Sequence, residues 1–313
     1  MRWKPIRFVP DGTKLPFMRW SRFGFILSGV LCALSIYLFA VHGLNYGIDF
    51  KGGTVLNIRT QQAVLVDDLR SRLGALGLGD VEVQQAGSPN DAIIRLEAQS
   101  GGDEEERAAV EKVKETLGNG IEYRSVEFIG PKVSAKISEE AILAVVVAIV
   151  GVLLYLWVRF EWQFAVGGVI SLLHDTLLTV GLFSILRLEF NLTIIAAILT
   201  IIGYSLNDTV VIYDRIREFL RKYKAMPLAD LIDFSLNSVL PRTLLTSVCT
   251  LISLFSLYFF AGDVIGGFTF AMIWGVFVGT YSSIFVAAPV LILLGTKRDW
   301  EASESRKVAE ARP

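Results

Sequence analysis

The residues best able to do chemistry in this sequence are charged side chains set inside long apolar runs. Asp208 lies in one such run, directly after Asn207, and Arg242 lies at the start of the next. An ionisable side chain inside a membrane-spanning helix is costly and therefore indicates a functional site. A carboxyl group in a low-dielectric environment retains its proton, and a nearby guanidinium favours its release. An aspartate and an arginine brought together there can therefore load and release protons.

The spacing of these residues predicts that they share one depth in the membrane. At ~1.5 Å per residue, Asp208 lies about 7–8 Å inward from the cytoplasmic end of its helix. Arg242 follows Pro241, which suits a first helical turn, and Thr246 lies one turn deeper on the same face. The alternative for Asp208 is a snorkelling or capping role, and Arg242 alone could simply follow the positive-inside rule.

A second polar pair lies within the third apolar run, where His174 precedes Asp175. Together with Asn207 this pair could give polar support to the intramembrane site, or it could form a satisfied hydrogen bond between helices. Gly275 and Gly279 have a spacing that favours close helix packing rather than a site.

The sequence offers little for other kinds of chemistry. The two cysteines, Cys32 and Cys249, lie inside apolar runs, and there are two histidines. A disulfide framework and a thiolate metal site are therefore excluded. The polar segment contains no Ser/His/Asp or Cys/His set and no phosphate loop, and a net charge of −1 gives no global field for nucleic acid. We expect no catalytic site, no metal and no cofactor.

The elements that position these residues follow from the composition. Hydrophobic residues make up 53% of the 313 residues, more than a surface that meets water usually permits. A membrane span needs ~20 mostly apolar residues. Six segments meet this requirement: 23–43, 139–158, 164–186, 190–213, 243–262 and 267–294. The first is longer than the apolar region of a typical signal peptide, so we expect an uncleaved anchor.

The distribution of basic residues predicts how these spans are oriented. Six basic residues precede the first span and six more lie between the fourth and fifth spans, whereas the two tight turns on the opposite side offer only Arg187. The positive-inside rule then places residues 1–22 and the tail 295–313 in the cytoplasm. Residues 44–138 lie on the exported side, and residues 139–294 form a five-helix membrane domain.

Residues 44–138 have a soluble composition and a different periodicity. Strands are predicted at 55–59, 81–85, 92–97 and 121–128, and helices at 66–76 and 104–117. The order β-α-β-β-α-β is typical of a ferredoxin-like α+β domain. The predicted fold is a polytopic α-helical membrane protein with six transmembrane helices and a ferredoxin-like exported domain between the first two. Such a domain decides no function by itself, and a docking or lever role is the simplest interpretation.

Several motifs resemble those of the SecD/SecF family of protein-export membrane proteins, in particular its SecF-type members. They occur in order over nearly the whole chain: Asn45–Thr54, Gly130–Val133, His174-Asp175, Glu189–Leu192, Ile202–Val211, Tyr213–Glu218 and Arg242–Ser247. The resemblance implies that Asp208 is the intramembrane acid of the family and Arg242 its basic partner. It further implies that Thr246 is a polar neighbour on the proton path.

The first of these motifs also contains Asp49, to which the resemblance assigns no clear role. Gly52 and Gly53 follow directly, and their conformational freedom suits a hinge or a close backbone approach.

The resemblance implies partners as well. The family belongs to the proton-driven RND superfamily, whose members have two six-helix halves, so this chain would supply one half and SecD the other. It implies a subunit that, with SecD, uses the proton-motive force to promote export of preproteins through SecYEG in the bacterial inner membrane, among membrane lipids. The alternatives are a small-molecule RND-type exporter, for which the exported domain is small and charged, and a passive translocon scaffold. A membrane enzyme is disfavoured because no nucleophile–base set is present.

Overall fold

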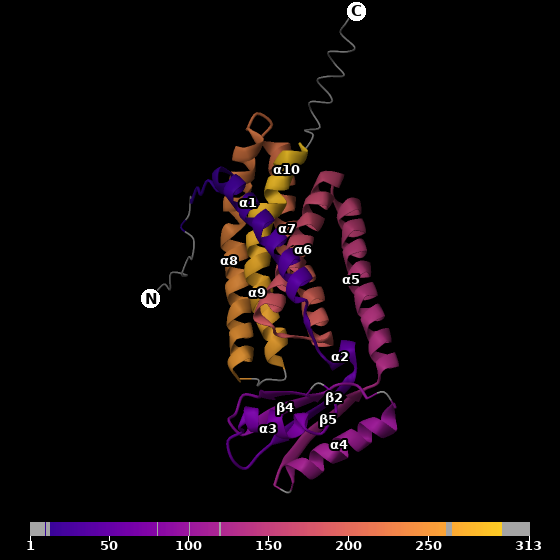
Figure 1. Cartoon of the computed structure of the whole chain (residues 1–313). Coiled ribbons are helices and arrows are strands. Elements are labelled where there is room, and N and C mark those ends of the chain that lie inside the picture. Colours follow the sequence, from indigo (N-terminus) through magenta and orange to yellow (C-terminus); the bar gives the residue numbers. More distant parts are fainter. Residues whose placement is uncertain are drawn as a thin grey trace, which may run out of the picture.

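Six long apolar helices make up most of the chain. The computed structural model describes residues 10, 13–79, 81–99, 101–118, 120–260 and 265–295. Within these ranges, six helical stretches are long and apolar enough to cross a membrane: α1 (Phe17–His42), α5 (Pro131–Arg159), α6 (Trp162–Leu186), α7 (Leu192–Lys222), α8 (Leu228–Phe260), and α9 (Gly266–Ser282) continued by the π-helical segment η2 (Ser283–Ala287) and α10 (Ala288–Leu294). They pack into one bundle (Figure 1). The predicted number of spans is therefore confirmed.

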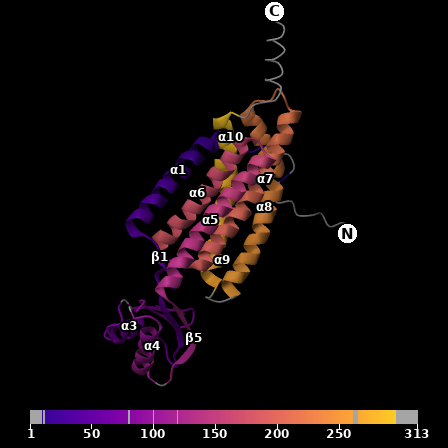
Figure 2. The same cartoon turned by 90° about the vertical axis from the view of Figure 1, so that its right-hand side faces the viewer.

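The helices of the bundle differ in how much of their surface is covered. α6, α7 and α9 are the most buried, whereas α1, α5 and α8 leave most of their side chains exposed. Figure 2 shows the same bundle from the side, with α5 in front and α1 and α8 at its two edges. The exposed side chains of the second group include Phe23, Val158 and Phe260. An apolar surface of this extent is suited to lipid or to a protein partner rather than to water.

Small residues bring α7 and α9 into close contact. A Cβ atom on Gly275 would lie 2.9 Å from Cγ2 of Ile201, and one on Gly279 would lie 3.0 Å from Cβ of Ser205. Larger side chains at either glycine would force the two helices apart. The predicted packing role of this glycine pair is confirmed.

Several helices extend beyond the predicted spans. α7 continues to Lys222 and α8 begins at Leu228, so Pro241 lies inside α8. The prediction that Pro241 occupies a first helical turn is therefore wrong. The turns before it stay helical because their apolar side chains, including Leu231 and Leu236, are buried in the core of the bundle. This burial offsets the hydrogen bond that a proline inside a helix removes.

The predicted cytoplasmic segments 1–22 and 295–313 are described only in part. The basic residues counted before Thr13 and after Gly295 lie outside the described residues.

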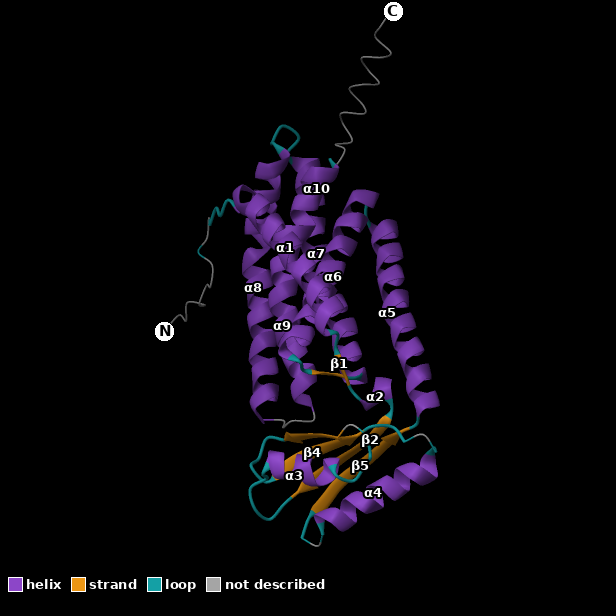
Figure 3. Ribbon diagram, viewed as in Figure 1, coloured by secondary structure: helices purple, strands orange, loops and turns teal. Residues whose placement is uncertain are grey.

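A four-stranded antiparallel sheet lies between α1 and α5 in the sequence. Its elements follow in the order β2 (Gly53–Arg59), α3 (Val66–Gly74), β3 (Val81–Gln85), β4 (Asp91–Leu96), α4 (Asp103–Leu117) and β5 (Glu122–Ile129). The strand order across the sheet is β3-β4-β2-β5. Ala92, Ile94 and Leu96 alternate along β4 and are buried in one core with Leu73 of α3 and Val113 of α4. This α+β domain lies at one end of the bundle (Figure 3).

Short elements join the α+β domain to the bundle. β1 (Asn45–Tyr46) pairs in parallel with β6 (Glu189–Phe190), which lies in the turn between α6 and α7. α2 (Ile48–Lys51) follows β1. The rings of Tyr46, Phe50 and Phe190 pack with centroids 5.9 to 6.3 Å apart. Residues far apart in the sequence therefore form one aromatic cluster at the junction.

Candidate intramembrane site and domain junction

Asp208 is a buried carboxyl group on α7. Asp208 is 4% exposed, and its Oδ2 atom has no hydrogen-bond partner among the described residues. Arg242 of α8 lies near enough for its positive charge to act on this carboxyl group. Burial favours the protonated form of such a carboxyl group, and an oxygen without a hydrogen-bond partner can carry the proton. A nearby positive charge favours release of that proton.

The structure places the other predicted site residues on an open face. Arg242 and Thr246 are exposed on α8, and Asn207 is exposed on α7. The Thr246 hydroxyl donates to the Thr243 carbonyl of its own helix, 2.9 Å away, rather than to Asp208. The structure therefore brings Asp208 and Arg242 into electrostatic range, while Thr246 and Asn207 face outward beside them.

His174 and Asp175 lie in the centre of the bundle, at 4% and 1% exposure. The Asp175 carboxylate accepts hydrogen bonds from Ser205 of α7 at 2.6 Å and from Ser282 of α9 at 2.9 Å. Its other oxygen lies 2.9 Å from Nδ1 of His174. Asp175 therefore ties α6 to two neighbouring helices, and a carboxylate with this many partners suits a structural hydrogen-bond network. Ser205 and Ser282 were not singled out in the sequence, because a serine inside an apolar helix carries no distinctive pattern.

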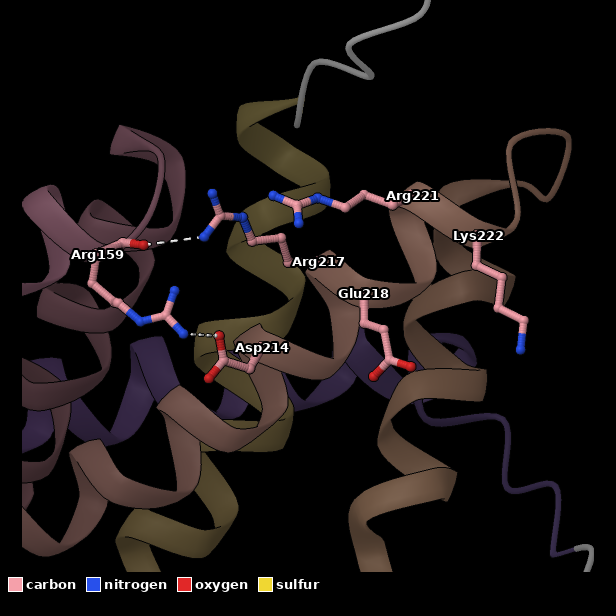
Figure 4. Close-up of a pocket in the computed structure, with 6 residues that line it drawn as sticks. All are labelled: Arg159, Asp214, Arg217, Glu218, Arg221 and Lys222. Carbon is pink, nitrogen blue, oxygen red and sulfur yellow. Dashed lines mark hydrogen bonds and ion pairs between the residues drawn. The ribbon is translucent and has the colours of Figure 1, made fainter.

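A shallow cavity of about 380 Å³ lies between the end of α5 and the last turns of α7 (Figure 4). These helix ends are at the far end of the bundle from the α+β domain (Figure 1). The walls of the cavity carry four basic and two acidic side chains: Arg159, Arg217, Arg221, Lys222, Asp214 and Glu218. Arg159 forms an ion pair of 3.0 Å with Asp214, and Arg217 donates to the Arg159 carbonyl at 3.2 Å. These contacts join the end of α5 to the end of α7.

Charged residues also meet at the junction between the α+β domain and the bundle. Arg95 of β4 forms an ion pair with Glu189 of β6. Burial raises the pKa of Glu189 above its ordinary value, and the Arg95 guanidinium opposes that rise. Asp49, whose role the sequence left open, accepts a hydrogen bond of 2.7 Å from the Leu192 backbone N–H, which belongs to the first turn of α7. An acidic side chain at this position accepts a hydrogen bond from an N–H group that has no partner within the helix, and its negative charge interacts favourably with the positive end of the helix dipole.

The two adjacent glycines of the first motif adopt conformations that other residues avoid. Gly52 has φ +75° and Gly53 has φ +120°. A Cβ atom on Gly52 would lie 3.1 Å from the Ile129 carbonyl oxygen, and one on Gly53 would overlap the Leu96 carbonyl oxygen. The predicted close backbone approach is confirmed, and it occurs where β2 enters the sheet between β4 and β5.

Taken together, six apolar helices, a buried carboxyl group within them that lies in the field of an arginine, and a small α+β domain define a multi-pass membrane protein of the transport type. Two regions of the chain match known families. Residues 109–297 match "Protein export membrane protein SecD/SecF, C-terminal", and residues 37–64 match the "SecD/SecF GG Motif". The chain belongs to the SecD/SecF family of protein-export membrane proteins, as its motifs predicted, and its function lies in protein translocation in the bacterial inner membrane.

Named relatives agree with this assignment. The protein translocase subunit SecF of Rhodobacter capsulatus is 43% identical over 314 residues, which covers 96% of this chain and 94% of that protein. The protein translocase subunit SecDF of Brucella abortus is 42% identical over 302 residues, covering 96% of this chain but 40% of that protein. The crystal structure of SecDF, a translocon-associated membrane protein from Thermus thermophilus, has a TM-score of 0.84 at 33% identity, covering 94% of this chain and 40% of that one.

Proposed function

We propose that this chain works with a SecD partner to couple proton movement to the export of preproteins through SecYEG. The observation that carries the proposal is the buried Asp208 carboxyl group, whose Oδ2 atom has no hydrogen-bond partner in the described part of the chain and which lies in the field of Arg242. Its position within α7 suits a group that binds a proton from one side of the membrane and releases it to the other. The proton is the coupling ion, and no cofactor or metal takes part.

The partner is inferred from the open face beside this site. Arg242 is exposed in the single chain although its charge acts on the buried Asp208 carboxyl group, and Asn207 and Thr246, on the same two helices, are exposed as well. A charged group at this depth needs a polar partner or a water-filled path, which a second six-helix half would supply. The fused SecDF relatives, of which this chain covers 40%, support SecD as that half.

The α+β domain serves as a ferredoxin-like exported domain in this proposal. Its element order and its sheet order β3-β4-β2-β5 support that description. Both termini are then cytoplasmic. With both native cysteines removed, an impermeant thiol reagent should label Ser88→Cys but not Lys224→Cys in cells whose outer membrane has been removed and whose inner membrane is intact. Labelling of Lys224→Cys alone would reverse the orientation.

The proton role is tested by replacing Asp208 with asparagine in the complete complex. Asn is nearly the same size and keeps hydrogen bonding, so folding and assembly should persist, but it cannot bind and release a proton. Export driven by the proton gradient should fall to the level measured with an uncoupler. The matched control is Asp214→Asn, because Asp214 is an acid on the same helix that is exposed and paired with Arg159. This variant should export normally.

Arg242→Lys separates two roles for the arginine. Lysine retains the charge but lacks the planar guanidinium, so export should fall if the geometry of the group matters and should stay normal if charge alone anchors the helix. Wild-type export by Asp208→Asn under a full proton gradient would contradict coupling through this residue. The chain would then act as a passive scaffold of the translocon.

A further inference from the structure

The Arg95 side chain connects two parts of the molecule that are far apart in the sequence. Arg95 lies on β4, and its Nη2 atom donates to Oε2 of Glu189, 94 residues later, in the turn before α7. Both side chains are largely covered, at 12% and 29% exposure. A charge-assisted hydrogen bond in such surroundings is far less screened than a surface ion pair. Arg95 is therefore a specific point of attachment between the α+β domain and the bundle.

Arg95 also has a second acidic neighbour inside its own domain. Its Nη1 atom lies 3.6 Å from Oε2 of Glu82, which is directly opposite Arg95 on the neighbouring strand β3. That distance is an ion pair but is too long for a hydrogen bond. The Nε and Nη1 atoms of Arg95 are buried and have no hydrogen-bond partner among the described residues. The guanidinium therefore has donors free to bond Glu82 if it leaves Glu189, so the buried charge need not be left unpaired.

The attachment reaches the beginning of the helix that carries Asp208. Glu189 lies three positions before Leu192, the first residue of α7, and the Leu192 N–H donates to Asp49 at 2.7 Å. A Cβ atom on Gly47 would lie 2.6 Å from Oε1 of Glu189, so glycine leaves room for this carboxylate. At ~1.5 Å per residue, Asp208 lies about 24 Å along the same helix. A shift or rotation of α7 would therefore act directly on Glu189.

We propose that Arg95 is a positioning residue that ties the α+β domain to α7 through Glu189 and exchanges this partner for Glu82 when the domain moves. The inference rests on the proposed proton-coupled function and adds the element that transmits it. Motion of α7 that follows proton binding at Asp208 reaches the side chains of the α+β sheet through this releasable ion pair. Arg95 does not touch a proton or a preprotein itself.

The test compares variants in the full chain, reconstituted with SecD and SecYEG in proteoliposomes. Two quantities are measured: export that depends on the proton gradient, and proton flux reported by a pH-sensitive dye. Arg95→Gln and Glu189→Gln should each lower gradient-dependent export about tenfold, a size typical of coupling between sites, while proton flux stays at the wild-type level. The double variant should be no worse than either single one, and the charge swap Arg95→Glu with Glu189→Arg should recover most of the export.

The matched control is Arg59→Gln, which removes an ion pair of 2.7 Å with Asp91, formed between strands β2 and β4 of the same sheet. It should leave export unchanged. Wild-type export by Arg95→Gln, additive losses in the double variant, or an equal loss in Arg59→Gln would each overturn the proposal. Asp208→Asn, measured in parallel, separates the two ideas. Export lost in Asp208→Asn but kept in Arg95→Gln refutes only the tie, whereas export kept in Asp208→Asn and lost in Arg95→Gln refutes only the proton function.

Discussion

Replacing Gly53 with alanine should weaken the α+β domain at the point where the chain enters its sheet. Gly53 has φ +120°, a conformation that residues with a Cβ atom rarely adopt. The new Cβ would overlap the Leu96 carbonyl oxygen and would lie 3.3 Å from the Ala98 N atom. Leu96 cannot move aside easily, because it pairs with Thr54 on one side and with Val81 on the other.

The size of the effect follows from two costs. A non-glycine residue in a strained backbone region costs about 1–3 kcal/mol. Moving the Leu96 carbonyl away from the new methyl group weakens one ladder hydrogen bond, which costs about 1 kcal/mol. The opening free energy of β2 and β4 should therefore fall by about 2–4 kcal/mol. Since about 1.4 kcal/mol corresponds to a factor of ten, their amide hydrogen exchange should become about a hundredfold faster.

Hydrogen exchange with mass spectrometry on the full chain in detergent measures this change peptide by peptide. The matched control is Gly74→Ala in α3, where φ is not positive and an added Cβ would meet no atom within 4 Å. Alanine should stabilise that helix by about 0.5–1 kcal/mol and slow its exchange. Wild-type exchange of β2 and β4 in Gly53→Ala, with the expected slowing in Gly74→Ala, would refute the reasoning.

Two further predictions concern charged groups. Asp175→Ala should lower the thermal unfolding midpoint in detergent, because the buried Ser205 hydroxyl then loses the acceptor that it bonds in the wild type, at a cost of about 1–3 kcal/mol. The exposed Asn207→Ala should stay near wild type, and equal midpoints for both would contradict this. In the α+β domain, the hydrogen bond from Arg59 lowers the pKa of Asp91 below its ordinary value of 3.8. The ion pair therefore stabilises the folded domain above pH 3.8. This stabilisation disappears as the pH falls through the lowered pKa that Asp91 has in the folded protein. Thermal unfolding of the wild type and of Asp91→Asn should therefore differ at neutral pH and converge only in strong acid; a gap that closes already near neutral pH would refute this.

The features set by local physics could be predicted from the sequence. Apolar runs of sufficient length identify membrane helices because the hydrocarbon core has a fixed thickness. The Gly275–Gly279 spacing indicated close packing because two glycines one turn apart expose the helix backbone. Alternation along β4 and the turns around it marked the strands in the same way. Each of these patterns depends only on residues near one another in the chain.

The start of α8 could not be predicted, because two local signals conflict there. Pro241 suits a helix start, and the residues before it are less hydrophobic than a membrane span requires. Their helical structure depends instead on burial of Leu231 and Leu236 against other helices, which the sequence alone does not show. The same register turns Thr243 and Ser247 inward and leaves Thr246 exposed.

The contacts that join distant segments were also beyond the sequence. The Asp175 carboxylate was noted, but its serine donors come from two other helices. The ion pair between Arg95 and Glu189 depends on where the α+β domain lies on the bundle. Glu189 belongs to one of the family motifs, but nothing in the sequence connects it with Arg95. Such partners become visible only when the packing of whole elements is known.

The parallel pairing of β1 with β6 has a consequence for how the protein is made. The Asn45 side chain donates to the Arg187 carbonyl, 142 residues later, and Arg95 donates to Glu189, 94 residues later. At a synthesis rate of about 5–20 residues per second, Arg95 emerges about 5–20 s before its partner. During that interval Glu82 has been synthesised and Glu189 has not, so the nascent α+β domain folds with Arg95 paired to Glu82. Docking onto the bundle is therefore a late event in biogenesis, and it occurs only after the α6–α7 turn has been synthesised.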